Sequence, residues 1–170
     1  APVADHRLPL GEVEGVAVNG ILRRRRHLVL VAQNQTGLNN LFKLVSESYK
    51  AENFYRYPRI DYKLLKKYSE GIIASSACLG GVYAGNYWEN REDGDEAVMN
   101  AMRETTKNMI DVFGDRWYAE IQWNNIKEQH ELNQYVIRVA KEFGVKLIST
   151  ADSHYPNPEA WKDRELYKRL

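Results

Sequence analysis

The sequence predicts an α/β fold in which parallel strands are covered by helices. Short apolar, β-prone runs alternate along the chain with longer stretches whose apolar residues recur at helical spacing. The chain has 170 residues, of which 44% are hydrophobic, so it can bury one core and is expected to form one domain. This alternation is typical of a (βα) barrel or of a doubly wound sheet, and the pattern leaves both open.

The first half of the chain begins with a strand followed by a helix. Residues 27–32 (HLVLVA) form a short apolar run that favours a strand, and an amphipathic stretch follows over 38–50 after a polar turn. A short helix is expected over 61–71, because an aspartate can cap its start and a glycine its end. The run IIAS at 72–75 predicts a buried strand, and SACLGG at 76–81 predicts a loop.

In the second half, two long helices flank a strand. Residues 95–114 carry apolar residues on one face and end on a glycine, and residues 128–144 show the same pattern. Between them, RWYAEIQW at 116–123 alternates as a half-buried strand does. VKLIST at 145–150 predicts an apolar strand, and the Asn-Pro pair at 157–158 predicts the start of a last helix.

The charge of the chain is nearly balanced, with 24 basic and 23 acidic residues and a net charge of +1. No global field therefore attracts a nucleic acid or a membrane, and any such binding must come from a local patch. The sequence has no apolar run of membrane-spanning length and no secretory signal pattern. A single cysteine fits a reducing compartment, so a cytoplasmic location is expected. We also expect a fragment, because the chain lacks an initial methionine and stops within a predicted helix.

Potential metal-binding side chains lie at the ends of three predicted strands. Folds of this class place their chemistry in the loops at the carboxyl ends of strands. Asp152 and His154 follow one strand, and in an extended segment residues two apart point to the same side. Cys78 follows another strand, and His27 begins a third. Carboxylate, imidazole and thiolate are ligands of zinc, manganese or iron, so these residues form a candidate metal site.

Each of these residues also has a simpler structural interpretation. Asp152 can cap the turn that follows it, while His154 packs under Tyr155. Cys78 can be a small buried apolar residue, which is the commoner role of a free cysteine. His27 can be a histidine whose hydrogen bonds are satisfied at the start of a strand. Spacing alone leaves these alternatives open, but four such residues at three strand ends favour a metal site.

Other patterns give weaker signals for binding. The run Arg23–Arg26 could contact phosphates in a salt-sensitive way, although such runs more often form solvated loops. The aromatic residues over 49–57 have basic neighbours, and here packing and hydration are favoured over base stacking. His6 and His130 are interpreted as structural or exposed. The sequence contains neither of the common Gly-rich phosphate loops and no G-x-S-x-G elbow.

Four segments occur in an order that resembles a known family. They are HLVLVAQNQTGLNNLFKLVSESY, YPRIDYKLLKKYSEGIIASSACLGG, RWYAEIQ and KEFGVKLISTADSHY. Together they resemble the PHP (polymerase and histidinol phosphatase) domain at the amino end of bacterial or phage replicative DNA polymerase III alpha subunits. Ala77 stands where the family usually has glycine, and Ala151 where it usually has asparagine. Residues 1–22 stay unassigned, and 23–170 are expected to form a partial PHP-like domain.

This resemblance implies a distorted parallel (βα) barrel, incomplete at its N-terminus, with divalent metal ions at its carboxyl rim. The family's metal ligands are matched here by His27, Cys78, Asp152 and His154. Zinc or manganese is expected, incompletely bound in this chain. The family's N-terminal His-x-His and Asp-His-Gly ligands have no counterpart, and either Glu12 or Glu14 could stand for its glutamate.

The resemblance also implies a function in DNA replication. A complete site of this kind would cleave phosphodiesters from the 3' end of DNA, and little of that activity is expected from this chain alone. The implied parent protein is a DNA-directed DNA polymerase. Its expected partners are DNA, the rest of the alpha subunit, a proofreading exonuclease subunit and other replisome components, with no membrane. The alternatives are a stand-alone phosphoesterase acting on a small phosphate ester, or a structural remnant that binds no metal.

Overall fold

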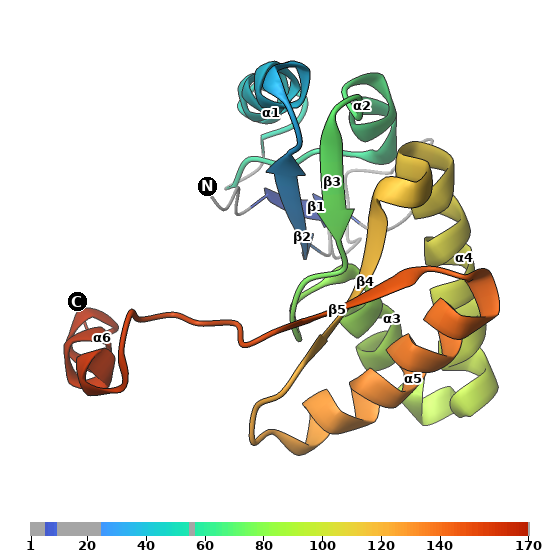
Figure 1. The fold of residues 1–170 in the computed structure, drawn as a ribbon, viewed down its shortest axis with the longest axis vertical. Helices are drawn as coiled ribbons and strands as arrows, with labels where there is room; N and C mark the ends of the chain where they lie inside the picture. The colour runs from blue at the N-terminus through green and yellow to red at the C-terminus, as the bar shows by residue number, and fades with distance from the viewer. Residues whose placement is uncertain (1–5, 10–24, 55–56, 170) are drawn as a thin grey trace.

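A computed structural model describes residues 6–9, 25–54 and 57–169. In this part of the chain, five strands form a sheet in the order β1-β2-β3-β4-β5, with helices packed around it except for the C-terminal helix, which lies apart (Figure 1). The strands are β1 (His6–Pro9), β2 (Arg25–Ala32), β3 (Ile72–Ser75), β4 (Trp117–Gln122) and β5 (Lys146–Thr150). The predicted α/β class is confirmed, and the arrangement is consistent with part of a (βα) barrel.

In the described part of the chain, six α-helices and three short 3₁₀ turns accompany the strands. The helices are α1 (Gln35–Ser48), α2 (Tyr62–Lys67), α3 (Val82–Asn90), α4 (Asp95–Phe113), α5 (Lys127–Phe143) and α6 (Trp161–Tyr167). The turns are η1 (Arg91–Asp93), η2 (Gly114–Arg116) and η3 (Pro158–Ala160). None of the helices in the described ranges combines the length and the apolar character that a membrane crossing requires.

The strands are parallel in only part of the sheet. β3, β4 and β5 run parallel, as the sequence predicts, but β2 is antiparallel to both β1 and β3. Between β2 and β3 the chain forms α1 and α2, which lie beyond the end of these strands (Figure 1). A connection that crossed a face of the sheet would return the chain in the same direction, whereas this one turns it back. The first residues of β2 therefore lie beside the end of β3.

Side-chain caps and a glycine explain where several helices begin and end. Asn34 accepts a hydrogen bond from the backbone N–H of Gly37 at 2.9 Å, and Asp61 caps α2 in the same way. Helix α2 ends at Lys67, earlier than predicted. At the end of α5, Gly144 adopts a left-handed conformation with φ of 67°, which is a common helix termination.

The sheet and helices α1 to α5 share one cluster of buried apolar side chains. Its members include Leu44 of α1, Met102 of α4, Trp117 of β4 and Val136 of α5, all at most 1% exposed. The apolar faces predicted for 95–114 and 128–144 account for the packing of α4 and α5 against each other and against the strands.

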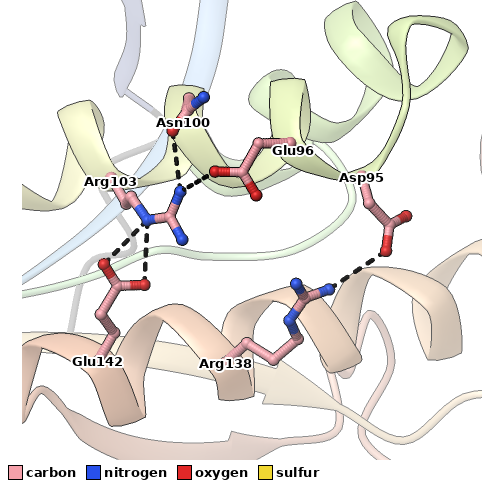
Figure 2. A network of polar contacts seen from close by, with 6 residues as sticks. All are labelled: Asp95, Glu96, Asn100, Arg103, Arg138 and Glu142. Atoms are coloured by element: carbon pink, nitrogen blue, oxygen red, sulfur yellow. Dashed lines mark hydrogen bonds and ion pairs between the residues drawn. The ribbon is translucent and has the colours of Figure 1, made fainter.

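The seam between α4 and α5 carries a polar network on its outer side. Arg103 of α4 donates hydrogen bonds to both oxygens of Glu142 of α5, at 2.9 and 3.0 Å (Figure 2). The same guanidinium also contacts Glu96 at 2.6 Å, and Arg138 of α5 lies 3.4 Å from Asp95. These side chains are largely exposed, so their contribution to stability is small.

Two features of the second half differ from the sequence prediction. Helix α3 was not predicted, because its residues from Val82 to Tyr87 are all buried and show no alternation between apolar and polar faces. Strand β5 is present as predicted, but all five of its residues are exposed or only partly buried, and Leu147 is 44% exposed. The apolar composition of β5 therefore does not reflect burial among the described residues.

Candidate metal centre

His27 and Cys78 meet because β2 and β3 run in opposite directions. The backbone N–H of His27 donates a hydrogen bond to the carbonyl of Gly80 at 2.8 Å. Its Nδ1 atom lies 3.5 Å from the Sγ atom of Cys78. A histidine at the start of one strand thus reaches a cysteine that follows the carboxyl end of another. The antiparallel register makes this possible, since two parallel strands would place these two ends at opposite edges of the sheet.

The loop that carries Cys78 is tightly folded against the start of β2. Ala77 adopts a positive φ of 61°, and the backbone N–H of Gly80 donates to the Cys78 sulfur at 3.5 Å. A Cβ atom on Gly80 would lie 3.2 Å from the His27 ring, and one on Gly81 would lie 2.0 Å from the carbonyl oxygen of Ser76. The two glycines therefore allow the loop to approach the imidazole closely.

The surroundings of the Cys78 sulfur disfavour a thiolate. Burial raises the pKa of the Cys78 thiol, and the negative charges of Asp152 and Glu120 raise that pKa further. The hydrogen bond from Gly80 opposes this effect. Without a metal, these surroundings disfavour the Cys78 thiolate. A bound metal cation would balance the negative charges and make the thiolate favourable.

Asp152 and His154 are exposed in the bend that follows β5. Asp152 has a positive φ of 50°, so this segment does not have the extended conformation that the prediction assumed. The Nδ1 atom of His154 lies 2.6 Å from the backbone oxygen of Asp152. Within the described ranges, no three His, Cys, Asp or Glu side chains are grouped so that they could hold a metal ion.

The donor atoms that do meet suit zinc chemically. Zinc is held by imidazole nitrogen, thiolate sulfur and carboxylate oxygen, usually with about four donors in total. His27 and Cys78 supply two of them at one point, and the charge of Asp152 acts at the same sulfur. The residues present therefore fit part of a metal site. Manganese would depend more strongly on carboxylate donors than this pair provides.

A buried glutamate next to these loops was not predicted as a functional residue. Glu120 of β4 is 7% exposed, and its carboxylate accepts hydrogen bonds from Ser75, Gln122 and Thr150. The sequence signal was the polar pair Glu120 and Gln122 on one face of a strand. Because strand residues two apart share a face, two buried polar side chains near a strand's carboxyl end indicate a polar cluster rather than a solvated surface.

The arginine run and the aromatic segment have structural partners where they are described. Arg26 pairs with Glu89 of α3, so the interpretation of this run as a solvated loop is wrong at that residue. Arg23 and Arg24 lie outside the described residues. Tyr49 stacks on Phe54 with ring centroids 6.0 Å apart. This contact agrees with the packing interpretation of the aromatic segment.

The remaining candidate residues lie apart from the Cys78 loop or outside the described part. His130 is exposed on α5, with its ring 6.1 Å from that of Trp123. His6 lies in β1, and its side chain is outside the described part of the structure. Glu12 and Glu14, the alternatives for a family glutamate, also lie outside the described residues.

The sequence of this chain is similar to a known domain family and to known proteins. The sequence model of a family described as "PHP domain" matches residues 10–124, a range that includes His27, Cys78 and Glu120 but ends before Asp152. The DNA polymerase III subunit alpha of Aquifex aeolicus is 48% identical over 133 residues, which are 78% of this chain and 11% of that protein.

Two further relatives carry the same name. The DNA polymerase III subunit alpha of Borreliella burgdorferi is 42% identical over 134 residues, which cover 78% of this chain and 11% of that protein. That of Helicobacter pylori is 40% identical over 147 residues, which cover 85% of this chain and 12% of that protein. The chain therefore spans about one eighth or less of the length of these relatives.

Proposed function

Because the chain belongs to the PHP domain family, we propose that residues 23–170 form part of the PHP domain of a replicative DNA polymerase III alpha subunit. The names of the three relatives support this assignment. The protein would act in DNA replication as a nucleotidyltransferase, and the carboxylates that polymerise DNA would lie outside this chain. A cytoplasmic location agrees with that role.

The proposed site holds a divalent metal ion, zinc or manganese. Its ligands in this chain are His27, Cys78, Asp152 and His154. One observation carries the proposal: Nδ1 of His27 lies 3.5 Å from Sγ of Cys78, although 51 positions separate them in the sequence. Imidazole nitrogen and thiolate sulfur are both zinc ligands, and Gly80 lets the Cys78 loop approach the His27 ring closely.

The site is proposed to cleave phosphodiesters from the 3' end of DNA. A bound metal would supply a water of lowered pKa and stabilise the charge that develops on the phosphate. The residues of this chain would orient that metal. Asp152 and His154 are exposed, so a DNA end could reach them from solvent. The proposed partners are DNA, the rest of the alpha subunit, a proofreading exonuclease subunit and other replisome components.

Metal analysis of the full-length protein tests the ligand assignment. We expect Cys78→Ser and His27→Ala each to lower zinc affinity at least tenfold, because each removes one of about four donors. His130→Ala is the matched control, since it removes an exposed histidine from α5. Equal metal content in the wild type and both ligand variants would rule out ligation by these residues.

The substrate class is tested separately, by incubating the metal-loaded protein with two substrates. We expect nucleotides to be released from the 3' end of DNA, and Asp152→Asn to slow this release about tenfold or more. A small aryl phosphate is the second substrate. Preferential hydrolysis of that ester would instead support a stand-alone phosphoesterase.

A further inference from the structure

Glu120 lies where three neighbouring parallel strands end. It is located in β4, the middle strand of the set β3-β4-β5, and its side chain is buried. A buried carboxylate requires hydrogen-bond partners, because its removal from water is otherwise strongly unfavourable. The residues that donate hydrogen bonds to Glu120 therefore show which strands its side chain connects.

Each donor to Glu120 is the last residue of its strand. Ser75, which ends β3, donates to the Oε2 atom. Thr150, which ends β5, donates to the Oε1 atom at 2.6 Å, and Gln122, which ends β4, donates to the same atom at 3.1 Å. One carboxylate thus joins the carboxyl ends of three strands.

The backbone pairing between β3 and β4 is short. The two strands pair at only two positions, Ala74 with Trp117 and Ser75 with Tyr118. The hydroxyl of Ser76 accepts a hydrogen bond from the Glu120 backbone N–H at 2.8 Å, which extends the contact past the end of β3. One backbone bond, from the Ser76 N–H to the Tyr118 carbonyl at 3.2 Å, also continues past β3. The bond from Ser75 to the Glu120 carboxylate therefore reinforces a short ladder between β3 and β4.

The candidate ligands follow these strand ends directly. Cys78 is three residues beyond Ser75, and Asp152 is two residues beyond Thr150. We infer that Glu120 is a positioning residue that holds the Cys78 loop and the Asp152 loop at a fixed separation. The inference rests on the metal site of the proposed function, and it adds the residue that determines the geometry of that site.

Glu120 is assigned a positioning role rather than ligation. Both of its oxygens accept hydrogen bonds from protein donors, and one accepts two. It does not belong to a group of three potential ligands among the described residues. Hydrogen bonds beyond the direct ligands commonly change metal affinity by about 10- to 100-fold, because they orient the groups that bind the metal.

Cobalt(II) binding to the full-length protein tests this role. Cobalt bound to a cysteine thiolate has a charge-transfer absorption that reports whether Cys78 is a ligand. We expect Glu120→Gln to weaken cobalt binding by about 10- to 100-fold. Thr150→Val should weaken it less and keep the charge-transfer band, because only the link to the Asp152 loop is lost.

Thr106→Val is the matched control. The hydroxyl of Thr106 is also buried, and it bonds Tyr83 and the backbone of Met102 away from the strand ends. We expect this variant to lose stability as Thr150→Val does, while its cobalt affinity stays within about twofold of wild type. If Thr106→Val and Thr150→Val weaken cobalt binding equally, the positioning role is wrong.

Amide hydrogen exchange without metal separates this inference from the proposed function. Glu120→Gln should speed exchange in both loops, at 76–80 and 151–154, whereas Thr150→Val should do so only at 151–154. A wild-type protein that binds no cobalt would contradict the proposed metal site. The exchange data would still test whether Glu120 holds the two loops. Unchanged exchange in both variants would overturn the role of Glu120. Ser75→Ala provides the same test at 76–80 if Glu120→Gln does not fold.

Discussion

Ala77 and Asp152 share an unusual backbone conformation in the two loops that carry candidate ligands. Among the described residues other than glycine, they are the two with positive φ, at 61° and 50°. Such a conformation places Cβ close to the following carbonyl oxygen and is unfavourable by about 1–2 kcal/mol. The sequence comparison already placed Ala77 where the resembled family usually has glycine. The structure supplies the physical reason, because glycine adopts this conformation without that strain.

Replacing Ala77 by glycine should therefore stabilise the protein. We expect Ala77→Gly to raise the free energy of unfolding by up to about 1 kcal/mol, because relief of strain exceeds the added entropy of the unfolded chain. Ala140→Gly, within helix α5, is the control and should lower the free energy of unfolding by about 2 kcal/mol, because it loses helix propensity and the burial of one methyl group. Urea denaturation measures both. A destabilised Ala77→Gly variant would show that the strain at this residue is negligible.

The elements that the sequence predicted correctly are those with a clear pattern. The strand at 27–32 and the helices at 95–114 and 128–144 have apolar residues at the spacing that their structure requires, and they are present. Helix α3 has no such pattern, because its residues from Val82 to Tyr87 are all buried. The antiparallel direction of β2 was missed because strand direction depends on the path of the connection, which residue patterns do not encode.

The candidate metal site could likewise be predicted only in part from the sequence. Residue type and position after a strand were sufficient to single out His27 and Cys78, which the structure brings together. The conformation after β5 could not be predicted, because Asp152 adopts a backbone state that is rare outside glycine. The role of Glu120 depends on Ser75 and Thr150 of two other strands, which become its neighbours only in the folded sheet.

Helix α1 is held against the loop before β3 by a contact between two glycines. A Cβ atom on Gly37 would lie 1.8 Å from the carbonyl oxygen of Gly71. The added methyl group would collide with a backbone atom rather than with a flexible side chain. Gly37→Ala should therefore lower the free energy of unfolding by about 3 kcal/mol or more. The control is Gly144→Ala, which has no heavy atom within 4 Å of its added Cβ but has a positive φ.

Thermal denaturation of the two glycine variants distinguishes crowding from backbone strain. Gly144→Ala should cost only about 1 kcal/mol, because it introduces strain without a collision. Comparable losses of stability in the two variants would mean that α1 shifts easily and that the close approach at Gly37 is not a constraint.

At the level of the whole molecule, a buried tyrosine links stability to high pH. Burial raises the pKa of Tyr62 to about 12 from its ordinary value of 10.0, with smaller contributions from the charges of Glu104 and Tyr83. Below pH 10 this tyrosine is neutral in both the folded and the unfolded protein. Between pH 10 and 12 it ionises mainly in the unfolded protein, so stability falls over that range.

Replacing Tyr62 by phenylalanine should reduce this alkaline loss. Two pKa units correspond to about 2–3 kcal/mol of stability, so urea denaturation at pH 8 and pH 11.5 should show a clearly smaller difference in Tyr62→Phe than in the wild type. Tyr118→Phe, on the partly buried side of β4, is the control. An identical pH dependence in Tyr62→Phe and wild type would assign the alkaline loss to other groups.

The opposite directions of β2 and β3 also determine where the chain can change in length. The pairing of Val29 with Ser75 and of Ala32 with Ile72 aligns His27 with the Cys78 loop. Deleting one residue within β2 would turn its side chains to the other face of the sheet and carry the imidazole away from the sulfur. The turn at 50–53 follows helix α1 and lies outside both strands, with most of its residues exposed. Insertions should therefore be tolerated in this turn and excluded from both strands.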